Sequence, residues 1–224
     1  MGFDSVLWCE ESDAVAMPAG QLAWTVALIG GSSGVGKTTT AERVGLRFGV
    51  PWLQLDDVRL ALQSSRVTLP ERTEALYFFE ETPNVWRLPP ERLRDGLIAL
   101  SDVLSVAVEA VVEKHVTSAT PVLIEGDSIV PSMLTRRSLR DAVDDKRVRP
   151  IFVIESEEEA IRASLEARGQ EHATPTDAEL RGEARAKWLH GQWLATEARD
   201  RGLAVLEARP WQTLALRIEA YLSS

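Results

Sequence analysis

An eight-residue segment near the front of this 224-residue chain constrains its fold more than any other feature. Residues Gly31-Ser32-Ser33-Gly34-Val35-Gly36-Lys37-Thr38 match the phosphate-binding pattern G-x-x-x-x-G-K-[ST]. The pattern is meaningful only between a strand and a helix, and the sequence supplies both. An apolar run over 24–30 predicts a buried strand, and the stretch 38–48 is compatible with a helix.

The residue types in this segment suit the binding of an anion. Glycine tolerates backbone conformations that let successive N–H groups converge on a phosphate, and the following helix adds its positive N-terminal end. We expect Lys37 to reach the β- and γ-phosphates and the hydroxyl of Thr38 to ligate Mg²⁺. The expected nucleotide-binding residues are Gly31, Ser32, Ser33, Gly34, Val35, Gly36, Lys37, Thr38 and Thr39. A Gly/Ser-rich turn that only joins a strand to a helix is the alternative.

Strands and helices alternate along the rest of the chain. Further apolar runs predict strands at 50–55, 121–125, 148–154 and 203–206, with a possible edge strand at 3–8. Helices are expected at 58–63, 90–116, 131–141, 157–168, 180–201 and 211–222, whereas 64–90 has an irregular pattern. Nearly continuous apolar strands indicate a parallel sheet that is covered on both faces.

We therefore expect an α/β fold of three αβα layers around a five-stranded parallel sheet, as one domain over 1–224. A helical insertion over 57–116 is expected to bind a small acceptor molecule, and 162–187 is expected to form a lid.

Acidic residues follow two of the predicted strands, where parallel sheets bind their ligands. Asp56 is expected to accept the proton of a substrate hydroxyl or to hold Mg²⁺, directly or through water. Asp57 and Arg59 are candidates for substrate contact, although Asp57 also suits a helix cap and Arg59 a solvated position. Glu125 is the candidate acid for Mg²⁺, and Asp127 for the metal or a substrate hydroxyl. Caps for the following segments are the competing interpretation of both strand-end acids.

Transfer of a phosphoryl group requires positive charge over the migrating group and exclusion of water. The expected lid carries four arginines, of which Arg168 and Arg185 are the candidate cations. Surface pairing with Glu157–Glu159 is the alternative. Arg209, before Pro210 and Trp211, is the candidate residue beneath an adenine ring, unless Pro210 simply starts the last helix.

Composition limits the partners of the chain. A net charge of −9 and a pI near 5.0 argue against nucleic acid as the main partner. A single cysteine, Cys9, excludes an intramolecular disulfide, and no apolar run is long enough to cross a bilayer. We expect a cytoplasmic monomer or homodimer without membrane contact. His115, His172 and His190 are scattered without metal-ligand spacing, which indicates surface or core positions.

Three segments together resemble the 2-phosphoglycerate kinase-like group of the nucleoside-monophosphate-kinase-like P-loop kinases. They are Ile29 to Thr38, Leu55-Asp56-Asp57-Val58-Arg59, and Val122 to Pro131, in which Ile124-Glu125-Gly126 and Val130-Pro131 carry the specific likeness. The resemblance implies ATP, Mg²⁺ and a small phosphate acceptor. It assigns Lys37 and Thr38 to the nucleotide and Mg²⁺, and Asp56 and Glu125 to the acids. Asp127 departs from the residue expected in that group, so the acceptor stays open.

The expected function is a small-molecule kinase that phosphorylates a hydroxyl of a 2-phosphoglycerate-like acid or another metabolite. An antibiotic phosphotransferase that resembles the chloramphenicol phosphotransferases is an alternative with the same architecture. A non-catalytic protein that binds ATP and engages a partner is another. A regulatory GTPase has little support, because Asn84 is followed by Val85-Trp86-Arg87 and no Thr-Lys-x-Asp occurs.

Overall fold

The computed structural model describes residues 22–69, 71–168 and 176–224. One five-stranded sheet has the order β2-β3-β1-β4-β5, and every neighbouring pair is parallel. The strands are β1 (Val26–Gly30), β2 (Trp52–Gln54), β3 (Val122–Gly126), β4 (Val148–Ile154) and β5 (Ala204–Glu207). The predicted parallel sheet is therefore confirmed, whereas the segment 3–8 lies outside the described residues.

Helices connect consecutive strands. They are α1 (Lys37–Phe48), α2 (Leu55–Ser64), α3 (Thr73–Glu81), α4 (Pro90–Ser118), α5 (Arg137–Asp144), α6 (Glu158–Arg168), α7 (Asp177–Asp200) and α8 (Leu214–Ser223), with short 3₁₀ segments η2 (Val85–Arg87), η3 (Pro131–Thr135) and η4 (Trp211–Thr213). In the part of the chain that the structure describes, none of these helices is long and apolar enough to cross a membrane.

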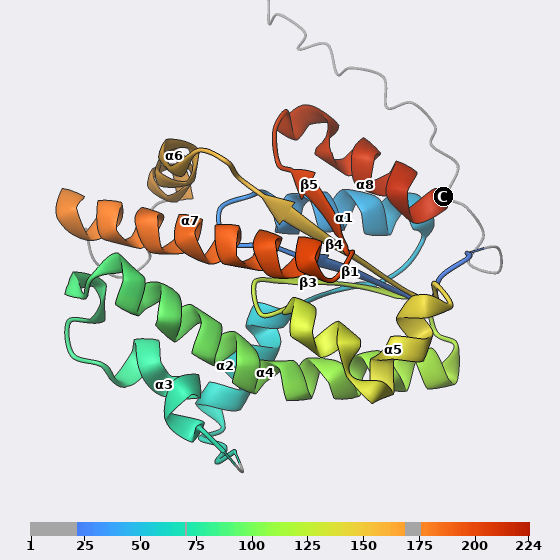
Figure 1. The fold of residues 1–224 in the computed structure, drawn as a ribbon, viewed down its shortest axis with the longest axis horizontal. Helices are drawn as coiled ribbons and strands as arrows, with labels where there is room; N and C mark the ends of the chain where they lie inside the picture. The colour runs from blue at the N-terminus through green and yellow to red at the C-terminus, as the bar shows by residue number, and fades with distance from the viewer. Residues whose placement is uncertain (1–21, 70, 169–175) are drawn as a thin grey trace, which may run out of the picture.

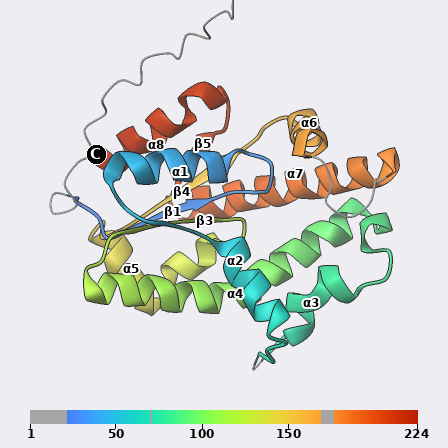
Figure 2. The same cartoon turned by 180° about the vertical axis from the view of Figure 1, so that it is seen from behind.

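The sheet is the middle of three layers. Every residue of β1, β3 and β4 is buried, which explains why these strands are almost continuous apolar runs, interrupted only by Glu125 in β3 and Arg149 in β4. Ile29 packs with Val44 of α1 and Ile218 of α8 on one face. Leu28 packs with Val108 of α4 and Leu194 of α7 in the core of the other face. Figures 1 and 2 show α1 and α8 on one side of the sheet and α4 and α5 on the other.

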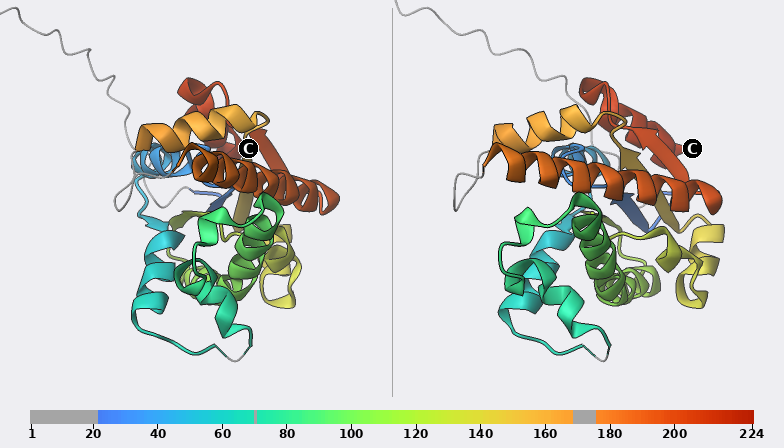
Figure 3. Two further views of the ribbon diagram at one scale, coloured as in Figure 1. Left: turned by 90° about the vertical axis from the view of Figure 1, so that its left-hand side faces the viewer. Right: turned by 60° about the vertical axis from the view of Figure 1, so that its left-hand side comes forward.

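Helices α2 and α3 and the first part of α4 form the insertion, which extends from the sheet on the side away from α6 (Figure 3). The irregular sequence pattern over 64–90 predicts no helix, yet α3 forms within this segment. Contacts distant in sequence hold it: Gln63 donates to the carbonyl oxygen of Leu76 at 2.7 Å, and the Tyr77 hydroxyl donates to that of Val67 at 2.9 Å. Leu76 also packs against Leu100 in a small separate core.

The predicted boundaries require three corrections. Strand β2 ends at Gln54, so Asp56 and Asp57 lie in the first turn of α2 rather than at a strand end. Gln54, not Asp57, occupies the N-cap position of that helix. The helices expected over 131–141 and 211–222 each begin with a 3₁₀ segment.

The described parts of the expected lid are the ends of α6 and α7. These helices pack together through Ile161, Leu165 and Ala184. Thr176 caps α7 with a hydrogen bond from the Glu179 backbone at 3.2 Å, and Glu179 accepts the reciprocal bond from the Thr176 backbone at 2.9 Å. Residues 169–175, in the middle of the expected lid, lie outside the described residues.

Candidate active site

The loop between β1 and α1 folds tightly against the neighbouring strand β4. Gly31 has a φ of +137°, and a Cβ at this position would lie 2.2 Å from the carbonyl oxygen of Val153. Only glycine fits such an approach without moving the backbone. The loop leads directly into α1, whose first residue, Lys37, is buried and donates from Nζ to the carbonyl oxygen of Ser32 at 2.9 Å.

Thr38 and Glu125 join the loop to the end of β3. The Thr38 hydroxyl donates to Glu125 Oε1 at 2.7 Å, and Glu125 is only 4% exposed. Burial raises the pKa of the Glu125 carboxyl, as do the charges of Asp56 and Asp127, while Lys37 and the Thr38 hydrogen bond lower it. A hydroxyl and a carboxylate are oxygen donors of the kind that Mg²⁺ prefers. The residues present therefore fit the expected magnesium site.

Asp56 lies near this pair but on the insertion side of the site. Its carboxylate accepts from Arg59 Nη2 at 3.3 Å and Nε at 3.4 Å, and its charge is one of those that act on Glu125. Arg59 also donates to Gln63 Oε1 at 3.1 Å. The Asp56 side chain is 63% exposed, and the adjacent Asp57 is exposed as well. The structure thus places Asp56 within electrostatic range of Glu125. Arg59 forms an ion pair with Asp56.

Asp127 continues the acidic edge beyond β3. It is half-buried, and its carbonyl oxygen accepts from the Ser101 hydroxyl of α4 at 3.3 Å. Its charge acts on Glu125 and on the imidazole of His190. His190 is buried beside this cluster, although the sequence offered no spacing pattern that could have selected it.

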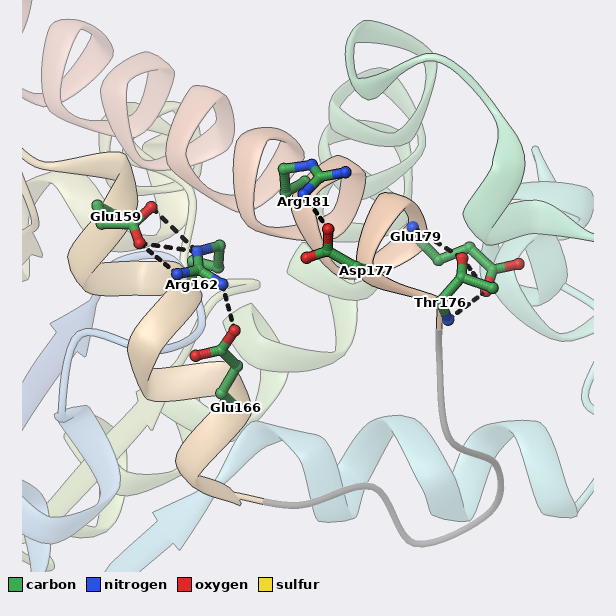
Figure 4. Close-up of polar contacts among 7 residues, drawn as sticks. All are labelled: Glu159, Arg162, Glu166, Thr176, Asp177, Glu179 and Arg181. Carbon is green, nitrogen blue, oxygen red and sulfur yellow. Dashed lines mark hydrogen bonds and ion pairs between the residues drawn. The ribbon is translucent and has the colours of Figure 1, made fainter.

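The four arginines of the expected lid have different surroundings. Arg168 Nη1 donates to the hydroxyl of Ser33, in the phosphate-binding loop, at 3.3 Å. Arg185 pairs with Glu158 at 2.6 Å and lies over the ring of Trp188. Figure 4 shows that the other two bind carboxylates of their own helices: Arg162 pairs with Glu159 and Glu166, and Arg181 with Asp177. The interpretation as surface pairing with Glu157–Glu159 describes Arg162 and the candidate cation Arg185, whereas Arg181 pairs with Asp177 instead.

A cavity of about 410 Å³ lies beside the phosphate-binding loop. Its lining comes from the loop, α1, α6 and the start of α8: Gly34, Gly36, Thr39, Thr40, Arg43, Ser164, Arg168, Trp211, Gln212, Leu214 and Ala215. Arg43 was missed by the sequence reasoning, although it follows Thr39 by one helical turn and so shares its side of α1.

Arg209 occupies a different position from the one expected beneath an adenine ring. Its guanidinium donates to Glu155 at 2.8 Å and pairs with Glu157 at 3.0 Å, and Arg209 does not line the cavity. The neighbouring Trp211, which is 44% exposed, does line it. The aromatic residue of this segment, rather than its arginine, therefore has the position suited to a flat base.

A glycine-rich loop of this geometry, at the carboxyl end of a parallel sheet and followed by Lys37, Thr38 and a strand-end acid, defines a protein of the P-loop class. No protein-family model matches the sequence. The chain is 28% identical over 193 residues to the 2-phosphoglycerate kinase of Methanocaldococcus jannaschii, which covers 81% of this chain and 58% of the relative. It is 30% identical over 149 residues to that of Methanothermobacter thermautotrophicus, which covers 64% and 47%.

The chain is thus a distant relative of the archaeal 2-phosphoglycerate kinases, as the resemblance predicted, and it spans about half the length of these curated relatives. A gluconokinase from Sinorhizobium meliloti 1021 is among the solved structures that it resembles, with a TM-score of 0.48, 15% identity and coverage of 90% of this chain and 92% of that chain.

Proposed function

We propose that this protein is an ATP- and Mg²⁺-dependent kinase that transfers the γ-phosphate to a hydroxyl group of a small molecule. The observation that supports it best is the joining of Lys37, Thr38 and Glu125 at one edge of the sheet, with Asp56 within electrostatic range. Phosphoryl transfer depends mainly on positioning and on charge stabilisation, and these residues supply both. The distant 2-phosphoglycerate kinase relatives make a small acceptor the natural class to test.

Each residue has a role that follows from its position. The backbone of Gly31 to Gly36 holds the phosphates, and Lys37 moves its ammonium from the Ser32 carbonyl oxygen to the β- and γ-phosphates. Thr38 and Glu125 would hold Mg²⁺, which supplies charge neutralisation between the phosphates. Trp211 and the cavity beside Thr39 accept the base.

Asp56 accepts the proton of the acceptor hydroxyl as its oxygen attacks the γ-phosphorus, and the bond to the β-γ bridging oxygen breaks to release ADP. The proton then passes from Asp56 to solvent. Arg168, at Ser33, extends over the outer side of the loop and neutralises charge on the transferred group. Asp57 is the least defined of these groups, because its carboxylate is exposed.

The test is ADP formation from ATP and Mg²⁺ across a panel of acceptors that includes 2-phosphoglycerate, chloramphenicol and polyhydroxylated metabolites. Lys37→Ala should reduce the rate by about 10²–10³-fold or more, because a charge on the reacting phosphates is lost. The matched control is Lys114→Ala, since Lys114 is exposed on α4. Turnover that survives Lys37→Ala would contradict a kinase, and ATP binding without turnover on any acceptor would favour a regulatory protein.

A further inference from the structure

His190 of α7 is buried in an unusual way. Its side chain is 1% exposed, and within the described residues neither ring nitrogen has a hydrogen-bond partner. The ring stacks on Trp193 with centroids 5.9 Å apart. A buried polar group without a partner destabilises the folded state, so a protein gains nothing in stability from keeping it.

The next residue of α7 touches the phosphate-binding loop. A Cβ on Gly191 would lie 2.9 Å from the hydroxyl oxygen of Ser32, so the helix and the loop are in close contact here. The Ser32 hydroxyl is itself buried and has no partner in the described structure, while its carbonyl oxygen accepts from Lys37. Two unpaired polar side chains therefore lie on adjoining segments, at the place where α7 covers the loop.

His190 interacts electrostatically with two charged residues at the same edge of the sheet. The imidazole is within electrostatic range of Asp127, beyond β3, and of Lys37 in the loop. Burial lowers the pKa of His190 to about 4, and Asp127 opposes this while Lys37 adds to it. The imidazole is neutral at physiological pH, so one nitrogen donates a hydrogen bond and the other accepts one.

Two cations on the segments around this place are already paired with carboxylates, whereas Lys37 donates to the carbonyl oxygen of Ser32. Arg59 pairs with Asp56, and on α7 Lys187 pairs with Glu183, with both of these side chains 14% exposed. Recognition of a carboxylate or phosphate acceptor group relies on convergent charged donors. The acceptor side instead offers hydroxyls, carboxylates and a neutral imidazole.

We propose that His190, Ser32 and Asp127 bind a free hydroxyl group of the acceptor, next to the hydroxyl that receives the phosphate. A hydroxyl both donates and accepts, as a neutral imidazole and a serine do, and it can also donate to a carboxylate. The acceptor is accordingly a polyhydroxylated molecule with a second free hydroxyl. 2-Phosphoglycerate has a single free hydroxyl and does not meet this requirement. The inference rests on the proposed kinase function.

The experiment measures binding of glycerol, sorbitol, D-glycerate and 2-phosphoglycerate to the full chain, with Mg²⁺ and a non-hydrolysable ATP analogue present. Wild type, His190→Leu and the control His115→Leu are compared by ligand-observed NMR, and thermal unfolding of each protein is recorded without ligands. His115 is the other described histidine, and it lies on α4, where its Nδ1 is 2.9 Å from the Thr120 carbonyl oxygen.

The expected result is binding of polyhydroxylated probes that His190→Leu weakens by about tenfold or more, equivalent to a lost buried hydrogen bond. Binding of the ATP analogue should be unchanged, and His190→Leu should melt no lower than the wild type. Binding of 2-phosphoglycerate alone, or of no polyhydroxylated probe, would overturn the proposal. So would probe binding that His190→Leu leaves intact. Failure of the ATP analogue to bind would instead count against the kinase function itself.

Discussion

Thr38 and Glu125 are separated by 87 positions in sequence, yet the hydroxyl of the former donates to the carboxylate of the latter at 2.7 Å. The contact ties the first turn of α1 to the end of β3. Ile29 of β1 is paired with Glu125 in the parallel register. The strand pairing therefore sets the position of this carboxylate along β3, beside the phosphate-binding loop that follows β1. In the proposed function, these two distant sequence segments would present their oxygen atoms to the same Mg²⁺ ion.

Glu125→Gln tests that arrangement. The amide keeps the shape of the side chain and removes the negative charge that supports Mg²⁺, so we expect activity or Mg²⁺ affinity to fall by about 10–100-fold. A titration of the initial rate against Mg²⁺ at saturating ATP separates the two effects. Glu219→Gln is the control, because Glu219 is a half-buried carboxylate of α8 that pairs with Arg47 at 4.0 Å. An unchanged Mg²⁺ dependence in Glu125→Gln would remove Glu125 from the metal site.

The sequence was most informative where structure depends on local chemistry. The loop from Gly31 to Thr38 requires particular residue types at fixed positions, and β3 and β4 are almost continuous apolar runs because both of their faces are covered. The loop pattern and the apolar runs are each contained within a short segment. The strand–loop–helix arrangement and the parallel sheet that they predict are both confirmed.

Tertiary contacts account for the structural features that the sequence did not predict. Leu55, the first residue of α2, packs tightly over Gly126, where a Cβ would lie 2.7 Å from the Leu55 Cβ. The α3 helix is held by a hydrogen bond from Gln63 of α2 to the Leu76 carbonyl oxygen within α3, and by one from Tyr77 of α3 to the Val67 carbonyl oxygen before it. His190 acquires its surroundings only when α7 lies across Ser32. None of these contacts leaves a periodic signal.

Asp56→Asn separates a proton acceptor from a structural residue. The substitution leaves the P-loop intact, so we expect kcat to fall by about 10²–10⁴-fold while the Kd for ATP stays within about twofold. Asp145→Asn is the matched control, since Asp145 follows α5, is exposed to a similar degree and pairs with Arg147 as Asp56 pairs with Arg59. Single-turnover rates and ATP binding by calorimetry provide the two measurements. Equal losses of rate and of ATP affinity would assign Asp56 a structural role.

Trp211→Ala tests the cavity beside the loop as the place of the nucleotide base. Stacking of a base on an aromatic ring contributes about 1–3 kcal/mol, so the KM for ATP should rise by about 5–150-fold with a smaller change in kcat. Leu216→Ala on α8 removes another exposed apolar side chain, 62% exposed, from outside the cavity lining. If both variants keep the wild-type KM, the base binds elsewhere.

His190→Leu should also change how the free energy of unfolding depends on pH, because burial lowers the pKa of the His190 imidazole in the folded protein. The unfolded imidazole has its ordinary pKa of 6.5, whereas burial lowers the pKa in the folded protein to about 4. Between these values the unfolded chain binds a proton that the folded chain does not, so the free energy of unfolding falls as the pH is lowered through this window.

The difference between the two pKa values corresponds to about 3 kcal/mol at its limit. His190→Leu removes this contribution, so its stability advantage over the wild type should grow steadily as the pH is lowered from about 7 to about 4. The raised pKa of Glu125 acts in both proteins and cancels in the comparison. Urea unfolding of the wild type and of His190→Leu at several pH values measures the difference. A difference that stays constant with pH would mean that the imidazole is not held neutral beside Asp127 and Lys37, and the proposed hydroxyl site would lose its physical basis.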